Sequence, residues 1–222
     1  MCNFLSAIVM KNGDLITNPQ FTDSHEDLLA ANNIRDGLAQ QGTFARIEFT
    51  PPEDLSTIQD LATWNLKVGE KVEPDWFDAP AVRAKLEDRV RRMFIDDERE
   101  FLLGGVYILL DGAKIKKVKN SRIVMMLGSS QVGAMRGSSM VRVMGDSSMV
   151  RVMRSSSQVG EMSGSSQVGE MLDSSQVGEM YHNSQVGKMW DSSMVRVMRD
   201  SSLVKKLYDR ARLPEGKEPL EG

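Results

Sequence analysis

The second half of the chain repeats itself every nine residues. Aligned units follow the pattern Ser-Ser-x-Val-x-x-Met-x-x and begin at Ser129, Ser138, Ser147, Ser156, Ser165, Ser174, Asn183, Ser192 and Ser201. Two degenerate units precede them, one carrying Ser121, Ile123 and Met126 and the other Ala113, Ile115 and Val118 at the corresponding positions. Eleven units with one period are typical of a repeat architecture, in which each unit packs only on its neighbours.

The period and the composition of a unit both argue against helices. Paired-helix repeats need about 33 residues or more. On a single long helix, nine residues turn through about 900°, so the repeat would not keep one face. Each unit also contains two serines, often a glycine, and a β-branched valine, which are poor helix formers.

A strand explains the repeat better. Positions 2 and 4 point to one side, position 3 to the other, and the chain bends at the outward positions 5 and 6. Position 7, usually Met, then returns inward, and positions 8 and 9 form a turn. We therefore predict a parallel β-solenoid, right-handed or left-handed, with two units in each 18-residue coil. Three units per coil is the alternative. Eleven units give about five and a half coils at about 4.8 Å per rung.

Two known repeat classes resemble this array in part. Nonapeptide β-rolls share its period, but their calcium-binding Gly-Gly-x-Gly-x-Asp pattern is missing, so we expect no bound calcium. Pentapeptide-repeat helices are similar in placing small and apolar residues inward two apart. Their period differs, so their DNA mimicry is not carried over.

Two unit types alternate irregularly, Gln-Val-Gly-Glu-Met and Met-Val-Arg-Val-Met. In an 18-residue coil, alternate units stack on the same side, so Leu172, Trp190 and Tyr208 would form one exposed edge column and Tyr181 and Arg199 would share the other edge. The first column is a candidate contact site, because exposed apolar patches often mark interfaces. The alternative is that the C-terminal tail or a neighbouring molecule covers it.

Composition divides the chain. All seven prolines lie outside residues 81–213, and 13 of the 16 methionines lie between Met125 and Met198. We expect a head domain over 1–110, the solenoid over 111–209 and a tail or cap over 210–222. A single cysteine cannot form an internal disulfide. No apolar run approaches 18 residues and the start does not match a secretory signal, so we expect no membrane span and a cytoplasmic location.

The first 110 residues have the mixed pattern of an α+β domain. Asn12-Gly13 between two apolar runs is a hairpin signal. Ser24 begins a capping box, and Asp78 followed by Pro80 opens a second helix. Strands are predicted over 4–10, 15–17, 43–50, 61–68 and 106–110.

Cys2 and His25 are the candidate catalytic residues. If Met1 is removed, a terminal cysteine could act as a nucleophile with its own amine as base, and His25 could supply an acid or base. The opening Met1-Cys2 resembles class II glutamine amidotransferases, although that family has Gly where this chain has Asn3. This is the alternative function, an amide hydrolase or transferase. The competing interpretation is a small buried cysteine and an ordinary histidine at a helix start.

Several short motifs together with the array resemble uncharacterised bacteriophage and prophage proteins: Met1–Met10, Asp23–Glu26, Ala45–Pro52 and Pro74–Asp78. The resemblance implies a phage origin and expression in the host cytoplasm, and it assigns no site residue.

We expect a non-enzymatic structural or interaction protein whose solenoid is a spacer or a protein-binding surface, with a protein partner or self-association. No metal or cofactor is expected. Nucleic-acid binding is not expected either, because Arg142, Arg151 and Arg196 are few and are interleaved with glutamates.

Overall fold

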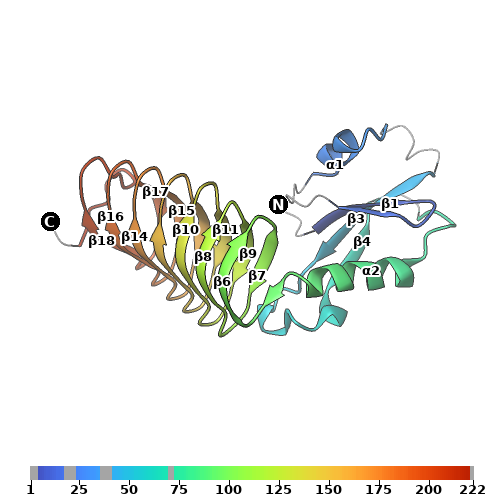
Figure 1. Ribbon diagram of the computed structural model, residues 1–222, viewed down its shortest axis with the longest axis horizontal. Coiled ribbons are helices and arrows are strands. Elements are labelled where there is room, and N and C mark those ends of the chain that lie inside the picture. Colours follow the sequence, from blue (N-terminus) through green and yellow to red (C-terminus); the bar gives the residue numbers. More distant parts are fainter. Residues whose placement is uncertain (1–4, 18–23, 36–41, 70–72, 221–222) are drawn as a thin grey trace. The chain divides into compact units, whose positions relative to one another are not determined.

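The computed structural model describes residues 5–17, 24–35, 42–69 and 73–220, in two compact units that divide between Arg92 and Met93 (Figure 1). The predicted order, an α+β unit followed by a parallel β-solenoid, is confirmed. The elements of the first unit are β1 (Leu5–Met10), β2 (Leu15–Thr17), α1 (His25–Ala31), β3 (Phe44–Thr50), η2 (Leu55–Thr57), η3 (Leu61–Thr63), β4 (Asn65–Val68) and α2 (Ala79–Arg91).

The first unit contains an antiparallel sheet in the order β2-β1-β3-β4. The predicted helix caps are present, since Ser24 accepts a hydrogen bond from the Asp27 amide and Asp78 from the Ala81 amide. The strand predicted over 61–68 forms only from Asn65 onward. Asp60 caps the Ala62 amide, and this cap stabilises the short 3-10 helix η3 in place of the first half of the strand.

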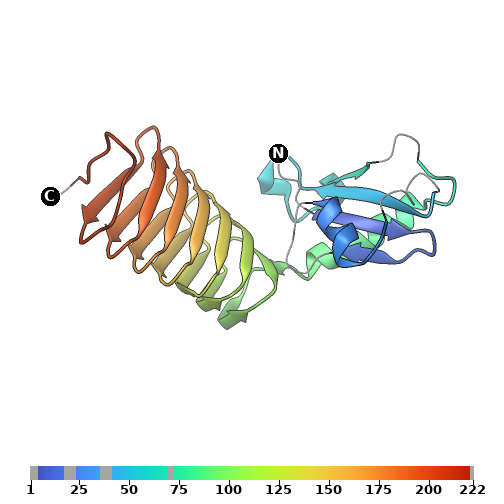
Figure 2. The same cartoon turned by 90° about the horizontal axis from the view of Figure 1, so that it is seen from above.

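The second unit is built from fourteen strands in two seven-stranded parallel sheets (Figure 2). We call the sheet in the order β18-β16-β14-β12-β10-β8-β6 the even sheet and the sheet in the order β17-β15-β13-β11-β9-β7-β5 the odd sheet. The strands are β5 (Phe94–Ile95), β6 (Glu98–Leu103), β7 (Val106–Leu109), β8 (Lys114–Lys119), β9 (Arg122–Met126), β10 (Gln131–Arg136), β11 (Met140–Met144), β12 (Met149–Met153), β13 (Gln158–Met162), β14 (Gln167–Met171), β15 (Gln176–Met180), β16 (Gln185–Met189), β17 (Met194–Met198) and β18 (Leu203–Leu207).

The coil length is 18 residues, as predicted. Val132 lies beside Val150 in the even sheet, and Val141 lies beside Val159 in the odd sheet. Successive nine-residue units therefore alternate between the two sheets. In each pair of neighbouring regular units the register runs through positions 3 and 4, skips position 5 and resumes at positions 6 and 7.

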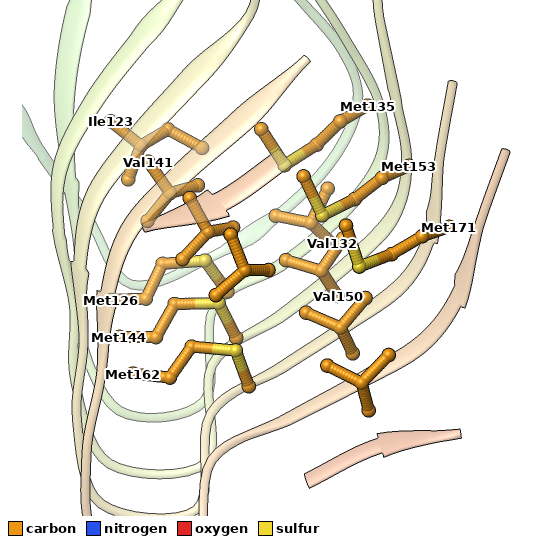
Figure 3. Close-up of a cluster of buried hydrophobic side chains, with 14 of the residues drawn as sticks. Ile123, Met126, Val132, Met135, Val141, Met144, Val150, Met153, Met162 and Met171 are labelled. Carbon is orange, nitrogen blue, oxygen red and sulfur yellow. The ribbon is translucent and has the colours of Figure 1, made fainter. Parts of the chain in front are cut away.

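The interior contains the three residue types predicted to point inward (Figure 3). In the regular units the valines of position 4 are 0–1% exposed and the methionines of position 7 are 0% exposed until Met198, at 7%. The position-2 serines from Ser130 to Ser193 are all fully buried. Several of their hydroxyls donate to the carbonyl three residues earlier, as Ser148 does to Gly145 at 2.8 Å. The small hydroxyl side chain therefore keeps the turn close to the apolar core.

The turns are fixed by a left-handed residue at position 9. These residues have φ between 51° and 65°, a region that Gly, Asn and Asp enter most easily. The aspartates also link coils, because their carboxylates accept from the backbone amide 18 residues earlier. Asp191 accepts from Asp173 and Asp200 from His182, both at 3.0 Å. His182 is thus a turn residue in this ladder.

Both ends of the solenoid differ from the predicted boundaries. β5, β6 and β7 pair in parallel with the later strands, so the solenoid begins at Met93, one coil before residue 111. They were placed in the head because they lack the Ser-Val-Met pattern. At the other end, the tail continues the repeat briefly: Ala211 is buried, Arg212 forms a bridge to Met194, and Leu213 packs on the core. The Leu220 amide then donates to the carbonyl of Val204.

Candidate functional site

The structure gives the two catalytic candidates no common site. Cys2 lies outside the described residues. The Nε2 atom of His25 lies 3.0 Å from the backbone carbonyl of Ile47, which ties the first residue of α1 to β3. A ring nitrogen facing a carbonyl must donate a proton to it, so this nitrogen is engaged in a structural hydrogen bond.

The predicted edge column is a stacked ladder at its C-terminal end. The rings of Trp190 and Tyr208 are parallel within 7° with centroids 3.8 Å apart, and Leu172 holds the same repeat position one coil earlier. On the other edge, the guanidinium of Arg199 lies 5.5 Å from the ring centre of Tyr181. Stacked rings turn their faces to each other, so this column presents mainly ring edges.

A more distinctive feature lies on the outer face of the even sheet. Here Arg151, Gly169, Gly187 and Lys205 occupy position 5 of four successive strands, β12, β14, β16 and β18. The two glycines have no side chain, and the flanking residues are long and cationic. The result is a concavity of about 450 Å³, which we call the basic groove, lined by Arg151, Val152, Gly169, Glu170, Gly187, Lys188, Lys205 and Lys206.

Backbone packing keeps the floor of the basic groove bare. A Cβ atom added to Gly187 would lie 2.4 Å from the carbonyl oxygen of Gly169, and one added to Gly169 would lie 2.5 Å from that of Arg151. These separations are far below van der Waals contact. A side chain could enter either position only if the backbone of the rung shifted, so the glycines hold the groove open.

The charges of the basic groove do not cancel. It contains four cations and one carboxylate, a formal charge of +3. Lys188 and Glu170 form an ion pair at 3.3 Å along one side. Arg151 and Lys205, at the two ends, are three rungs or roughly 14 Å apart. Val152 adds an apolar surface beside Arg151.

The odd sheet provides an internal comparison. Its position-5 residues Arg142, Gly160, Gly178 and Arg196 repeat the order of cation, two glycines and cation, and we call this set the opposite row. Its position-6 neighbours include two glutamates, Glu161 and Glu179, which balance the two arginines. The hydrogen bond from Tyr181 to Glu179 raises the pKa of this tyrosine. The two faces thus share a backbone plan and differ in charge.

The even sheet has a second hollow of about 490 Å³ nearer its N-terminal end, where Gly133 and Met149 lie beside Lys114 and Lys116. Both lysines pair with glutamates of β6: Lys114 with Glu98 at 2.9 Å, and Lys116 with Glu100. Its positive charge is therefore largely compensated, and Arg151, which lines both hollows, marks the start of the uncompensated region.

Within the described ranges, no cluster of three or more His, Cys, Asp or Glu side chains could hold a metal ion. No helix of the described chain combines the length and apolar character needed to cross a bilayer. The sequence did contain a signal for the basic groove that was not used. Alternate units share a sheet, and that rule alone places Arg151, Gly169, Gly187 and Lys205 in one row.

Comparison with protein-family models, with curated proteins and with solved structures finds no match to this chain.

Proposed function

We propose that the protein is a non-enzymatic scaffold whose solenoid binds a protein partner on its outer surface. One observation supports this most strongly: variation in the repeat is concentrated at outward positions. Position 2 of the regular units is always Ser, position 4 Val and, until Leu207, position 7 Met, and these residues form the core. Positions 3, 5 and 6 alternate between amide, apolar, glycine and charged residues.

The solenoid favours this role because it is quasi-one-dimensional. Each unit contacts only its neighbours, so outward residues can change without disturbing the core. The result is a surface with a row pattern that differs between the even and odd sheets. A spacer would not need the uncompensated charge and the open glycine floor of the basic groove.

The test is affinity capture from the native host cells with two forms of the protein. One is the full chain and the other lacks residues 147–182, four units that make up two whole coils and leave every remaining strand in its own sheet. We expect a saturable partner that the full chain retains and the shortened chain loses, while both give the circular dichroism of a β-solenoid. Equal capture and an unchanged oligomeric state would contradict the proposal.

The proposal also includes a phage origin and a cytoplasmic location, which rest on the sequence resemblance. Fractionation of the native cells tests the location: we expect the protein in the cytosolic fraction, and recovery with membranes or outside the cell would contradict it.

A further inference from the structure

We propose that the basic groove binds a short, extended, acidic segment of a partner protein. This inference rests on the proposed function and names the chemistry of the partner at one surface. It combines three observations on the described residues: a concavity of about 450 Å³, a bare floor formed by Gly169 and Gly187, and a formal charge of +3.

The dimensions suit an extended peptide. Arg151 and Lys205 stand at the ends of the glycine floor, roughly 14 Å apart, which is the length of about four residues in extended conformation. Gly169 and Gly187 leave room for a backbone to lie close to the sheet. Two carboxylates of the segment would face Arg151 and Lys205, and an apolar side chain between them would contact Val152.

Charge decides between an acidic segment and other partners. Arg151, Lys205 and Lys206 favour anions, and the pair between Lys188 and Glu170 supplies both a donor and an acceptor along one wall. A nucleic acid makes many phosphate contacts along a continuous basic surface. Here the positive region is short and holds Glu170, and the adjoining hollow contains Glu98 and Glu100. We therefore infer a peptide carrying a few carboxylates.

The opposite row gives the experiment its matched control. Arg151→Glu with Lys205→Glu changes the charge of the basic groove, and Arg142→Glu with Arg196→Glu makes the same change at the same repeat positions of the odd sheet. All four residues occupy position 5, which faces outward, so neither double variant alters the Ser, Val and Met core.

The probe is a fluorescein-labelled octapeptide of alternating Glu and Leu, and binding to the full-length protein is measured by fluorescence anisotropy at low and at physiological salt. We expect saturable binding that weakens with salt, at least tenfold weaker binding for the Arg151→Glu/Lys205→Glu variant, and a change below twofold for the Arg142→Glu/Arg196→Glu variant. A Lys-Leu octapeptide should not bind.

Three outcomes would overturn the inference: no binding of the Glu-Leu peptide, an equal loss in both double variants, or tighter binding of a single-stranded oligonucleotide that the groove variant loses in the same way. If the peptide does not bind while partner capture still depends on residues 147–182, the acidic segment is wrong and the scaffold function stands. If capture is also independent of those units, both are wrong.

Discussion

Replacing Met153 with alanine should destabilise the solenoid strongly, whereas the same change at Met149 should have little effect. Both methionines lie on β12, four residues apart, at positions 7 and 3. Met153 is 0% exposed and lies in register between Met135 and Met171, whereas Met149 is 36% exposed on the outer face. The pair therefore isolates burial from residue type and strand.

The magnitude follows from the atoms removed. Methionine to alanine deletes three heavy-atom groups beyond Cβ, and at about 0.8 kcal/mol for each buried group the transfer contribution is roughly 2.4 kcal/mol. The methionines above and below are held by their own rungs and fill the gap only in part, so a cavity contribution brings the expected loss at Met153 to about 2–5 kcal/mol. At Met149 we expect a change within about 0.5 kcal/mol.

The assay is urea unfolding followed by far-ultraviolet circular dichroism, together with hydrogen exchange of the peptides that cover β10 to β14. Exchange is needed because the two units can unfold separately, which would make a single transition ambiguous. A difference between the two variants of less than about 1 kcal/mol would refute the assignment of position 7 to the core.

Four further predictions follow from the ends and turns of the solenoid and from its hydrogen-bond ladder. Deleting residues 210–222 should uncover the edge of β17 and part of β18, which Arg212 and Leu220 now engage, and light scattering should detect self-association; a strictly monomeric truncated chain would contradict the capping role. Asp191→Ala should lower the thermal midpoint more than Asp191→Asn, because alanine loses both the acceptor for the Asp173 amide and the tolerance of φ 57°; equal midpoints would argue against the ladder. The backbone and hydroxyl hydrogen bonds from Ser129 lower the pKa of Asp111, so its stabilising contribution is present above the unfolded pKa of about 3.9 and is lost as pH falls through the folded value; Asp111→Asn should reduce the acid sensitivity of unfolding, and an unchanged acid midpoint would contradict this. Gly187→Ala should destabilise the chain because its Cβ would meet the Gly169 carbonyl at 2.4 Å, while Gly145→Ala, with no atom nearer than 3.8 Å, should be tolerated; similar melting curves would contradict the close approach.

The regular part of the solenoid was predictable because its inward residues are nearly invariant. Ser, Val and Met at positions 2, 4 and 7 define the alternation, and the 18-residue coil follows from the turn at positions 8 and 9. The first coil was missed for a physical reason. β6 is an edge strand, so Arg99 can occupy the place of the buried valine while remaining exposed. A terminal rung need not follow the core pattern.

The candidate site was predictable only in part. Parity placed Leu172, Trp190 and Tyr208 on one edge, and the stacking of Trp190 on Tyr208 agrees with that placement. The same parity would have aligned Arg151 with Lys205, but a row of glycines becomes a groove only when the rung spacing leaves no room for a Cβ. That condition depends on the approach of Gly169 to Gly187, which the sequence does not encode locally.

The central claim is that the serines, valines and methionines of successive units pack into one dry interior. Oxidation by dilute hydrogen peroxide, quantified for each methionine by mass spectrometry, tests it most directly, because sulfoxide formation requires access to the sulfur. The account predicts rapid oxidation of Met149 and much slower oxidation of the 0%-exposed methionines from Met126 to Met189. Comparable rates at Met149 and Met153 in the folded protein would contradict it.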